Sequence, residues 1–191
     1  VNLIIKIKKD KKYIKKKLIE NKYKKANVKF HVIPTDRIWI RDSGPIFLKN
    51  IKNNKRLFLN FKFNGWSKYK NYNKDDKINN FISKITKIKK IDPKIKIKNK
   101  IKRIVLEGGS IDVNGKGSIL LTKECLLSKT QERNPGMKKK QYEDILYKYL
   151  NVSNFIWLNK GIIGDDTHGH IDDISRFISK STIMTAVEVN K

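Results

Sequence analysis

The sequence predicts an α/β fold, and three observations support this class. Short apolar runs typical of strands alternate along the chain with longer segments that place apolar residues on one helical face. The clearest helical pattern puts Ile78, Phe81, Ile82 and Ile85 at the i, i+3, i+4, i+7 spacing. Strand ends that carry acidic or basic residues recur at near-constant intervals, which suggests a structural repeat.

The expected elements follow the order β, α, β, β, β, α, β, β, β, α, β, β, β. The first helix is lysine-rich with one apolar face, the second begins at acidic residues, and the third follows the NPG break at 134–136. The segment 92–100 is predicted to be a polar linker, and the pair Asn114 and Gly115 favours a tight hairpin turn. Strands are expected at 1–7, 28–34, 40–48, 56–63, 103–107, 155–158, 174–179 and 181–187, and on both sides of the Asn114–Gly115 turn. Helices are expected at 10–25, in a segment that begins at residue 75, and in another that begins at residue 137.

The segment GDDTHGHIDDISRF, residues 164–177, has the composition of an active-site loop. His170 could be a general acid and base, with Asp172 as an anion that binds a cation or orients the ring. Alternatively, His168 and His170 could bind a metal for a metal-dependent hydrolase, since HxHxD is similar to the motif of metallo-β-lactamase-type hydrolases. The chain has three histidines and no CxxC, so no metal site is expected. A polar turn with solvated carboxylates is the third interpretation.

Two other strand ends carry an acid into a glycine turn. The run 35–47 is expected to bury Trp39 and Ile40 before presenting Asp42, and the run 105–113 presents Glu107 before a diglycine. Asp42 and Glu107 are 65 positions apart, and Glu107 and His170 are 63 apart. A repeat that places one loop of each copy at a common centre would explain this spacing.

Five motifs together resemble the agmatine deiminase family, which includes the bacterial-type peptidylarginine deiminases. They are DRIWIRDSGPIF, FNGW at 63–66, LEGGS, LLTKECLLSKTQERNPG and GDDTHGHIDDISRF, and the resemblance extends from about Val28 to Phe177. It implies a pentein-type α/β propeller of ββαβ repeats, of which residues 1–191 would form a single domain portion with about two and a half repeats. It also implies hydrolysis of a guanidinium to a ureido group and ammonia, without a cofactor.

The resemblance assigns roles that suit the chemistry of a planar cation. Asp42 and Asp172 would hold the guanidinium from two sides, since a carboxylate accepts two of its N–H groups in parallel. His170 would protonate the departing ammonia and then activate water, and Glu107 would orient its ring and favour the charged form. Asn64 and Trp66 of the FNGW motif are expected to bind the substrate.

The sequence departs from the family at the nucleophile. The family's catalytic cysteine follows the GHID motif in a glycine-rich segment, whereas the single cysteine here, Cys125, lies in a run expected to be a strand and to bury it. We therefore expect a portion that lacks the amino-terminal start and the carboxyl-terminal nucleophile segment, and that is inactive alone. A non-catalytic relic or guanidinium-binding module is the alternative.

Charge and composition indicate which classes of partner are expected for this protein. The formal net charge is +27, but only six of the 45 basic residues are arginine, and lysine, asparagine and isoleucine abound throughout, as AT-rich coding produces. No dedicated nucleic-acid role and no membrane span are expected. One cysteine and no signal peptide favour a cytoplasmic protein. The expected partners are a small guanidino substrate, agmatine rather than peptidyl-arginine, and a second copy or a complementing carboxyl-terminal segment.

Overall fold

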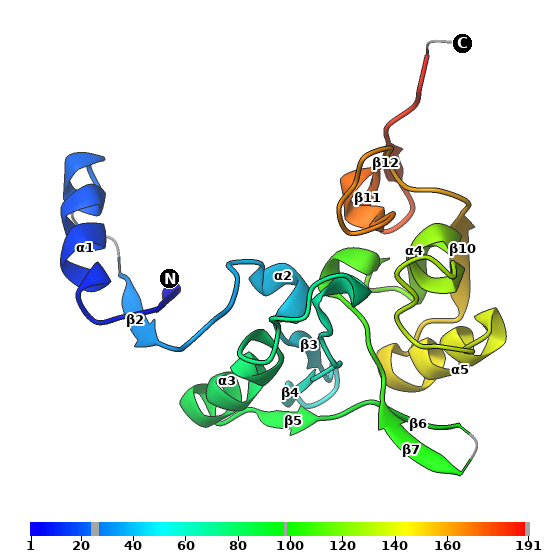
Figure 1. The fold of residues 1–191 in the computed structure, drawn as a ribbon, viewed down its shortest axis with the longest axis horizontal. Helices are drawn as coiled ribbons and strands as arrows, with labels where there is room; N and C mark the ends of the chain where they lie inside the picture. The colour runs from blue at the N-terminus through cyan, green and yellow to red at the C-terminus, as the bar shows by residue number, and fades with distance from the viewer. Residues whose placement is uncertain (24–26, 98, 190–191) are drawn as a thin grey trace.

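The computed structural model describes residues 1–23, 27–97 and 99–189, and these form an α/β protein of small mixed sheets and short helices (Figure 1). Two three-stranded sheets have the same topology, in which a hairpin is followed by a helix and a strand parallel to the hairpin's second strand. The predicted α/β class is confirmed.

The first ββαβ unit contains β3 (Ile46–Lys49), β4 (Arg56–Leu59), α3 (Ile78–Thr86) and β5 (Lys89–Ile91). β3 and β4 are antiparallel with Phe47 opposite Phe58, and β5 runs parallel to β4. The 3-10 turns η1 (Gly65–Ser67) and η2 (Asp75–Lys77) lie between β4 and α3. The strand expected from residue 40 is wrong at its start, because Ile40–Ser43 form the helical turn α2.

The second ββαβ unit contains β8 (Asp112–Val113), β9 (Ser118–Thr122), α4 (Lys123–Leu127), α5 (Lys139–Leu150) and β10 (Asn154–Leu158). The predicted hairpin turn is confirmed: Asn114 Oδ1 accepts hydrogen bonds from the backbone N–H groups of Lys116 and Ser118. Cys125 lies in α4, not in a strand as predicted. The strand ends at Thr122, whose Oγ1 accepts from Cys125 N (3.1 Å) and caps the helix.

Three further strand pairs flank these units. β1 (Asn2–Ile5) and β2 (Lys29–Val32) are parallel and joined through α1 (Asp10–Glu20), which lies apart from the other elements in Figure 1. The helix expected at 10–25 ends at Glu20, and residues 24–26 lie outside the described ranges. The strands predicted at 174–179 and 181–187 are confirmed as β11 (Ser175–Phe177) and β12 (Ile183–Thr185), which pair in antiparallel orientation.

The predicted linker at 92–100 is instead part of a hairpin, β6 (Lys94–Ile97) and β7 (Lys100–Arg103). Lysine and isoleucine alternate in this segment, which is the period-two pattern of a strand. The high lysine content led to the prediction of a linker instead.

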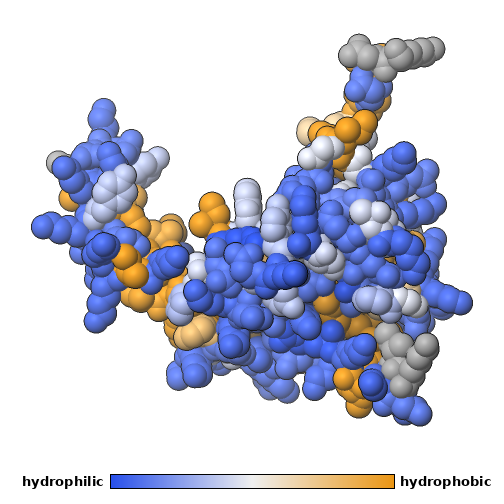
Figure 2. Space-filling view, viewed as in Figure 1, coloured by the Kyte–Doolittle hydropathy of each residue, from blue (hydrophilic) through white to orange (hydrophobic). Residues whose placement is uncertain are grey.

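The hydrophobic core lies mainly between the second unit and the strand segment that precedes it. Ile119 and Leu121 of β9, Leu146 of α5 and Leu106 are buried in it, together with Cys125. The apolar face expected for the third helix is therefore confirmed in α5. The surface is dominated by polar residues, with apolar patches near β2 (Figure 2). None of the helices in the described ranges has the length and apolar character needed to cross a membrane.

Candidate functional site

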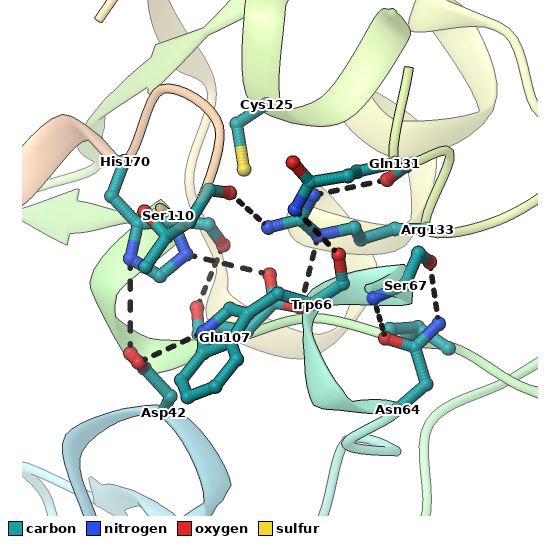
Figure 3. Close-up of polar contacts among 12 residues, drawn as sticks. Asp42, Asn64, Trp66, Ser67, Glu107, Ser110, Cys125, Gln131, Arg133 and His170 are labelled. Carbon is teal, nitrogen blue, oxygen red and sulfur yellow. Dashed lines mark hydrogen bonds and ion pairs between the residues drawn. The ribbon is translucent and has the colours of Figure 1, made fainter. Parts of the chain in front are cut away.

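Three turns meet at one centre, and each lies immediately before the first strand of a hairpin. Asp42 in α2 precedes β3, Glu107 precedes β8 through η3 (Gly108–Ser110), and His170 precedes β11 through η4 (Ile171–Asp173). The turn α2 contacts η3, and η3 contacts η4. Figure 3 shows the three side chains converging. The near-constant spacing in the sequence thus corresponds to equivalent positions in the structure.

The His170 loop is held in shape by Asp165. Its Oδ1 accepts from Thr167 N (2.8 Å), and its Oδ2 accepts from Gly169 N (2.8 Å) and His170 N (2.9 Å). Gly169 has φ +88, and a Cβ there would lie 2.9 Å from Glu124 Oε2. Asp165 is thus an organiser of the loop, a role that the sequence analysis did not identify.

His170 is buried and surrounded by three carboxylates. Its Nε2 lies 3.7 Å from Glu107 Oε2, and its Nδ1 lies 3.9 Å from both Asp42 Oδ1 and Asp172 Oδ1. Burial by itself lowers the pKa of the imidazolium, but Cys125 and Glu107 raise it by more, so the pKa of His170 lies above its ordinary value. Burial raises the pKa of the Cys125 thiol, so the carboxylate of Glu107 is the main group that favours the protonated ring. The cationic form of His170 is therefore favoured.

Glu107 stays ionised because Arg133 neutralises it. Arg133 Nε donates to Glu107 Oε1 at 3.1 Å, and both side chains are fully buried. Burial raises the pKa of the carboxyl, but Arg133 and His170 lower it by more. Arg133 also donates to the backbone carbonyls of Gln131 (3.0 Å) and Thr167, which ties Glu107 to the His170 loop.

Asp42 has neutral hydrogen-bond donors, although His170 also lies 3.9 Å from it. Its Oδ1 accepts from Gly109 N (3.0 Å) and its Oδ2 accepts from the indole Nε1 of Trp66 (3.1 Å). Burial is the largest influence and raises the pKa of Asp42 above its ordinary value. A Cβ at Gly109 would lie 2.4 Å from His170 Nδ1 and 2.7 Å from Asp42 Oδ1, so only glycine permits this close approach.

Asp172 is more accessible, with 18% of its side chain exposed. It is shared by two arginines: Arg41 Nε lies 3.5 Å and Arg176 Nη1 lies 3.8 Å from Oδ2. Its Oδ1 lies 3.9 Å from His170 Nδ1, the same ring nitrogen that Asp42 Oδ1 approaches.

A pocket of about 490 Å³ opens above this centre. Asp42, Trp66, His170 and Asp172 line it, and so does Trp39, which is 59% exposed. The expected burial of Trp39 and Ile40 is wrong, because the turn α2 directs both side chains outward. Besides that of Asp165, the roles of Trp39 and Arg133 in this region were not predicted from the sequence. The buried role of Arg133 could have been predicted from its residue type, because arginine is rare in this lysine-rich chain and is favoured in buried ion pairs.

Asn64 is separated from this pocket's lining. Its Oδ1 accepts from Ser67 N (2.9 Å) and its Nδ2 donates to Ser67 Oγ (2.8 Å), which fixes the turn η1 that carries Trp66 at φ 57. Asn64 lines a second pocket of about 700 Å³, whose wall includes Lys62, Lys102 and Arg103. A cationic ligand would be repelled there, so we take the smaller, acidic pocket as the candidate site.

Cys125 lies beneath this site. It is buried, and burial raises the pKa of its thiol. Two cationic side chains are its neighbours and were not expected: His170, 45 positions away in the sequence, and Arg133, eight positions away. One ligand atom each of Glu107, Cys125 and His170 lie within 4.8 Å of one another, whereas His168 belongs to no such group in the described part of the chain and instead contacts Ser128 Oγ (3.2 Å).

Fold and site together define an α/β protein with a buried acid–base centre below an acidic pocket. The chain belongs to the Porphyromonas-type peptidyl-arginine deiminase family, whose match covers residues 1–191. It is 34% identical over 165 residues to the agmatine deiminase of Pseudomonas savastanoi pv. phaseolicola, covering 84% of this chain and 42% of that protein.

Solved structures show the same relationship. An agmatine deiminase of C. jejuni with substrate bound matches 96% of this chain and 49% of its own, with a TM-score of 0.76 and 35% identity. The agmatine deiminase of Enterococcus faecalis matches 100% of this chain and 48% of its own, with a TM-score of 0.77 and 27% identity. The chain spans about half the length of these relatives.

Proposed function

We propose that this chain forms part of a guanidine deiminase that hydrolyses agmatine to a ureido product and ammonia. The observation that supports this most strongly is the position of Asp42 and Asp172, each 3.9 Å from Nδ1 of His170 in an acidic pocket. Two carboxylates and one acid thus surround a single point, as attack on a bound guanidinium carbon requires. The names of the relatives favour agmatine over peptidyl-arginine.

Each charged group has a separate task in this reaction. Asp42 and Asp172 accept the forked N–H groups of the guanidinium and fix its plane. His170, held as a cation by Glu107, donates its proton to the nitrogen that leaves as ammonia. The neutral ring then removes a proton from the water that hydrolyses the intermediate. Trp66 keeps Asp42 in position, and Trp39 is a partly exposed residue of the pocket lining.

The nucleophile is proposed to come from a carboxyl-terminal segment or a complementing chain. A guanidinium is a poor electrophile, so the attack calls for a thiolate. Cys125 is unsuited because burial keeps it a thiol and it is not part of the pocket lining. The residues described here would then bind agmatine without turning it over.

The pentein-type propeller is part of the same proposal. Two ββαβ units of identical topology, preceded by β1–α1–β2 and followed by β11–β12, fit a ring of such repeats around the acid–base centre. Assembly as a homo-oligomer and a cytoplasmic location are proposed with it, since one buried cysteine suits a reducing compartment.

A guanidinium-binding module without activity is the second candidate. It is favoured by the combination of an intact pair of carboxylates with a single, buried cysteine. Addition of a complementing segment would distinguish the two, because only an enzyme would then release ammonia.

The test is calorimetric titration of agmatine. Asp42→Ala and Asp172→Ala should each weaken binding about ten- to hundredfold, the loss of a charged hydrogen-bonding partner. Asp144→Ala is the matched control, since it removes the same charge from an exposed position on α5 and should leave affinity unchanged. Unchanged affinity in both site variants would show that the site is elsewhere. Ammonia release by the chain alone that disappears in Cys125→Ser would overturn the assignment of the nucleophile.

A further inference from the structure

Glu107, Cys125 and His170 form a compact cluster of three different metal-ligand types. They come from three segments: the strand end before η3, the helix α4, and the loop before η4. All three are almost completely buried, at 0%, 1% and 2% exposure, and one ligand atom of each lies within 4.8 Å of the others. Figure 3 shows the sulfur of Cys125 pointing into the space between His170 and Arg133.

Two atoms of this cluster are buried without a hydrogen-bond partner among the described residues: Glu107 Oε2 and His170 Nε2. They face each other at 3.7 Å, which is too long for a hydrogen bond. Arg133 does not satisfy this oxygen, since its Nε donates to the other one, Oε1. A buried carboxylate oxygen and a buried ring nitrogen therefore face each other without a hydrogen bond, beside the buried thiol of Cys125.

This donor set suits Zn²⁺. Thiolate, imidazole and carboxylate are its three usual ligands, and three protein ligands leave one coordination position open. Ligand atoms around a tetrahedral zinc lie about 3.3–3.6 Å apart, given the usual zinc–ligand bond lengths. The nitrogen–oxygen separation of 3.7 Å already approaches this range, and the three ligand atoms lie within 4.8 Å of one another.

We propose that Glu107, Cys125 and His170 bind one Zn²⁺ ion, and that the bound ion blocks the acid–base centre. His170 lines the floor of the pocket, so the ion reaches the cluster from there. Binding replaces the thiol proton and the proton of the imidazolium, both of which leave to water. Because Zn²⁺ brings two positive charges and the two protons remove two, the buried net charge beside Arg133 does not change. No metal site was expected from the sequence, because the chain has three histidines and no CxxC motif.

The experiment is a titration of the chain with Co²⁺, the spectroscopic substitute for Zn²⁺. A thiolate ligand gives cobalt an intense near-ultraviolet charge-transfer band, and the chain has only one cysteine to produce it. We expect this band to saturate at one Co²⁺ per chain and to disappear when Zn²⁺ is added. Cys125→Ala should abolish the band, and His170→Gln should weaken cobalt affinity at least about tenfold.

His168→Gln is the matched control, because it removes a histidine two positions away that lies outside the cluster. It should leave both the band and the affinity unchanged. X-ray absorption at the zinc edge of the native chain tests the same claim without a variant, and should find one sulfur neighbour. No charge-transfer band, or a zinc shell that contains only nitrogen and oxygen, would overturn the proposal. Neither readout depends on deiminase activity, so the proposed function can fail while this site is confirmed.

Discussion

The two ββαβ units place an acid at the same position but give it opposite surroundings. Asp42 precedes β3 and accepts only from neutral donors, Gly109 N and Trp66 Nε1, whereas Glu107 precedes β8 and is paired with Arg133. The pKa of Asp42 is raised, mainly by burial, and that of Glu107 is lowered because Arg133 and His170 outweigh burial. The shared topology therefore brings both acids to the centre, and the groups around each acid set its role. Asp42 is available to bind a cationic ligand, whereas Glu107 stabilises the protonated form of His170.

The largest effect is expected from breaking the pair that distinguishes the second unit. Arg133→Met leaves Glu107 as a buried charge with reduced compensation, so the free energy of unfolding should fall by about 3–5 kcal/mol in urea denaturation. Removing both charges, with Glu107→Gln added, should lower stability less than Arg133→Met alone. Lys140→Met, which breaks an exposed pair on α5, is the control and should have no measurable effect. Equal losses for the buried and the exposed pair would contradict the role given to Arg133.

A smaller loss of stability is expected from adding a side chain at Gly109, where the turns that precede the two units come into close contact. An added methyl group would overlap His170 Nδ1 and Asp42 Oδ1, so Gly109→Ala should cost about 1–3 kcal/mol of stability and also weaken agmatine binding. Gly136→Ala is the matched control: it has φ +78 and nothing within 4 Å of the new Cβ. It should cost about 1 kcal/mol and leave agmatine affinity intact. If agmatine affinity fell equally in both variants, the steric argument would be wrong.

The smallest effect concerns the pH dependence of binding. Because the pKa of Asp42 is raised, its carboxylate is lost as pH falls through that raised value, earlier than an ordinary aspartate would lose its charge. Agmatine affinity should therefore fall by up to about tenfold per pH unit below that point, while Glu107 remains ionised. Calorimetry across mildly acidic pH measures this, and Asp42→Asn should remove this part of the dependence. A native profile identical to that of Asp42→Asn would show that another group controls binding.

The α/β class, most elements and the meeting of Asp42, Glu107 and His170 could be predicted from local signals, namely strand periodicity and regularly spaced acid-bearing turns. The place of Asp172 beside them was predicted from the resemblance to the family. The sequence was not sufficient for Arg133 or for the surroundings of Cys125, since both depend on contacts between segments far apart in the chain. The hairpin at Lys94–Ile97 was missed because lysine dominated an alternating pattern. Trp39 was expected inside because an apolar run does not reveal that a helical turn will direct it outward.

The central claim is that Glu107, and not Asp42, determines the charge of His170. The most direct measurement is an NMR titration of the His170 ring in the native chain and in Glu107→Gln. We predict that native His170 stays protonated above its ordinary pH range, and that in Glu107→Gln burial dominates, so the pKa falls and the ring is neutral near pH 7. Asp42→Asn should cause a smaller change. Identical titration of His170 in the native chain and in Glu107→Gln would contradict the account.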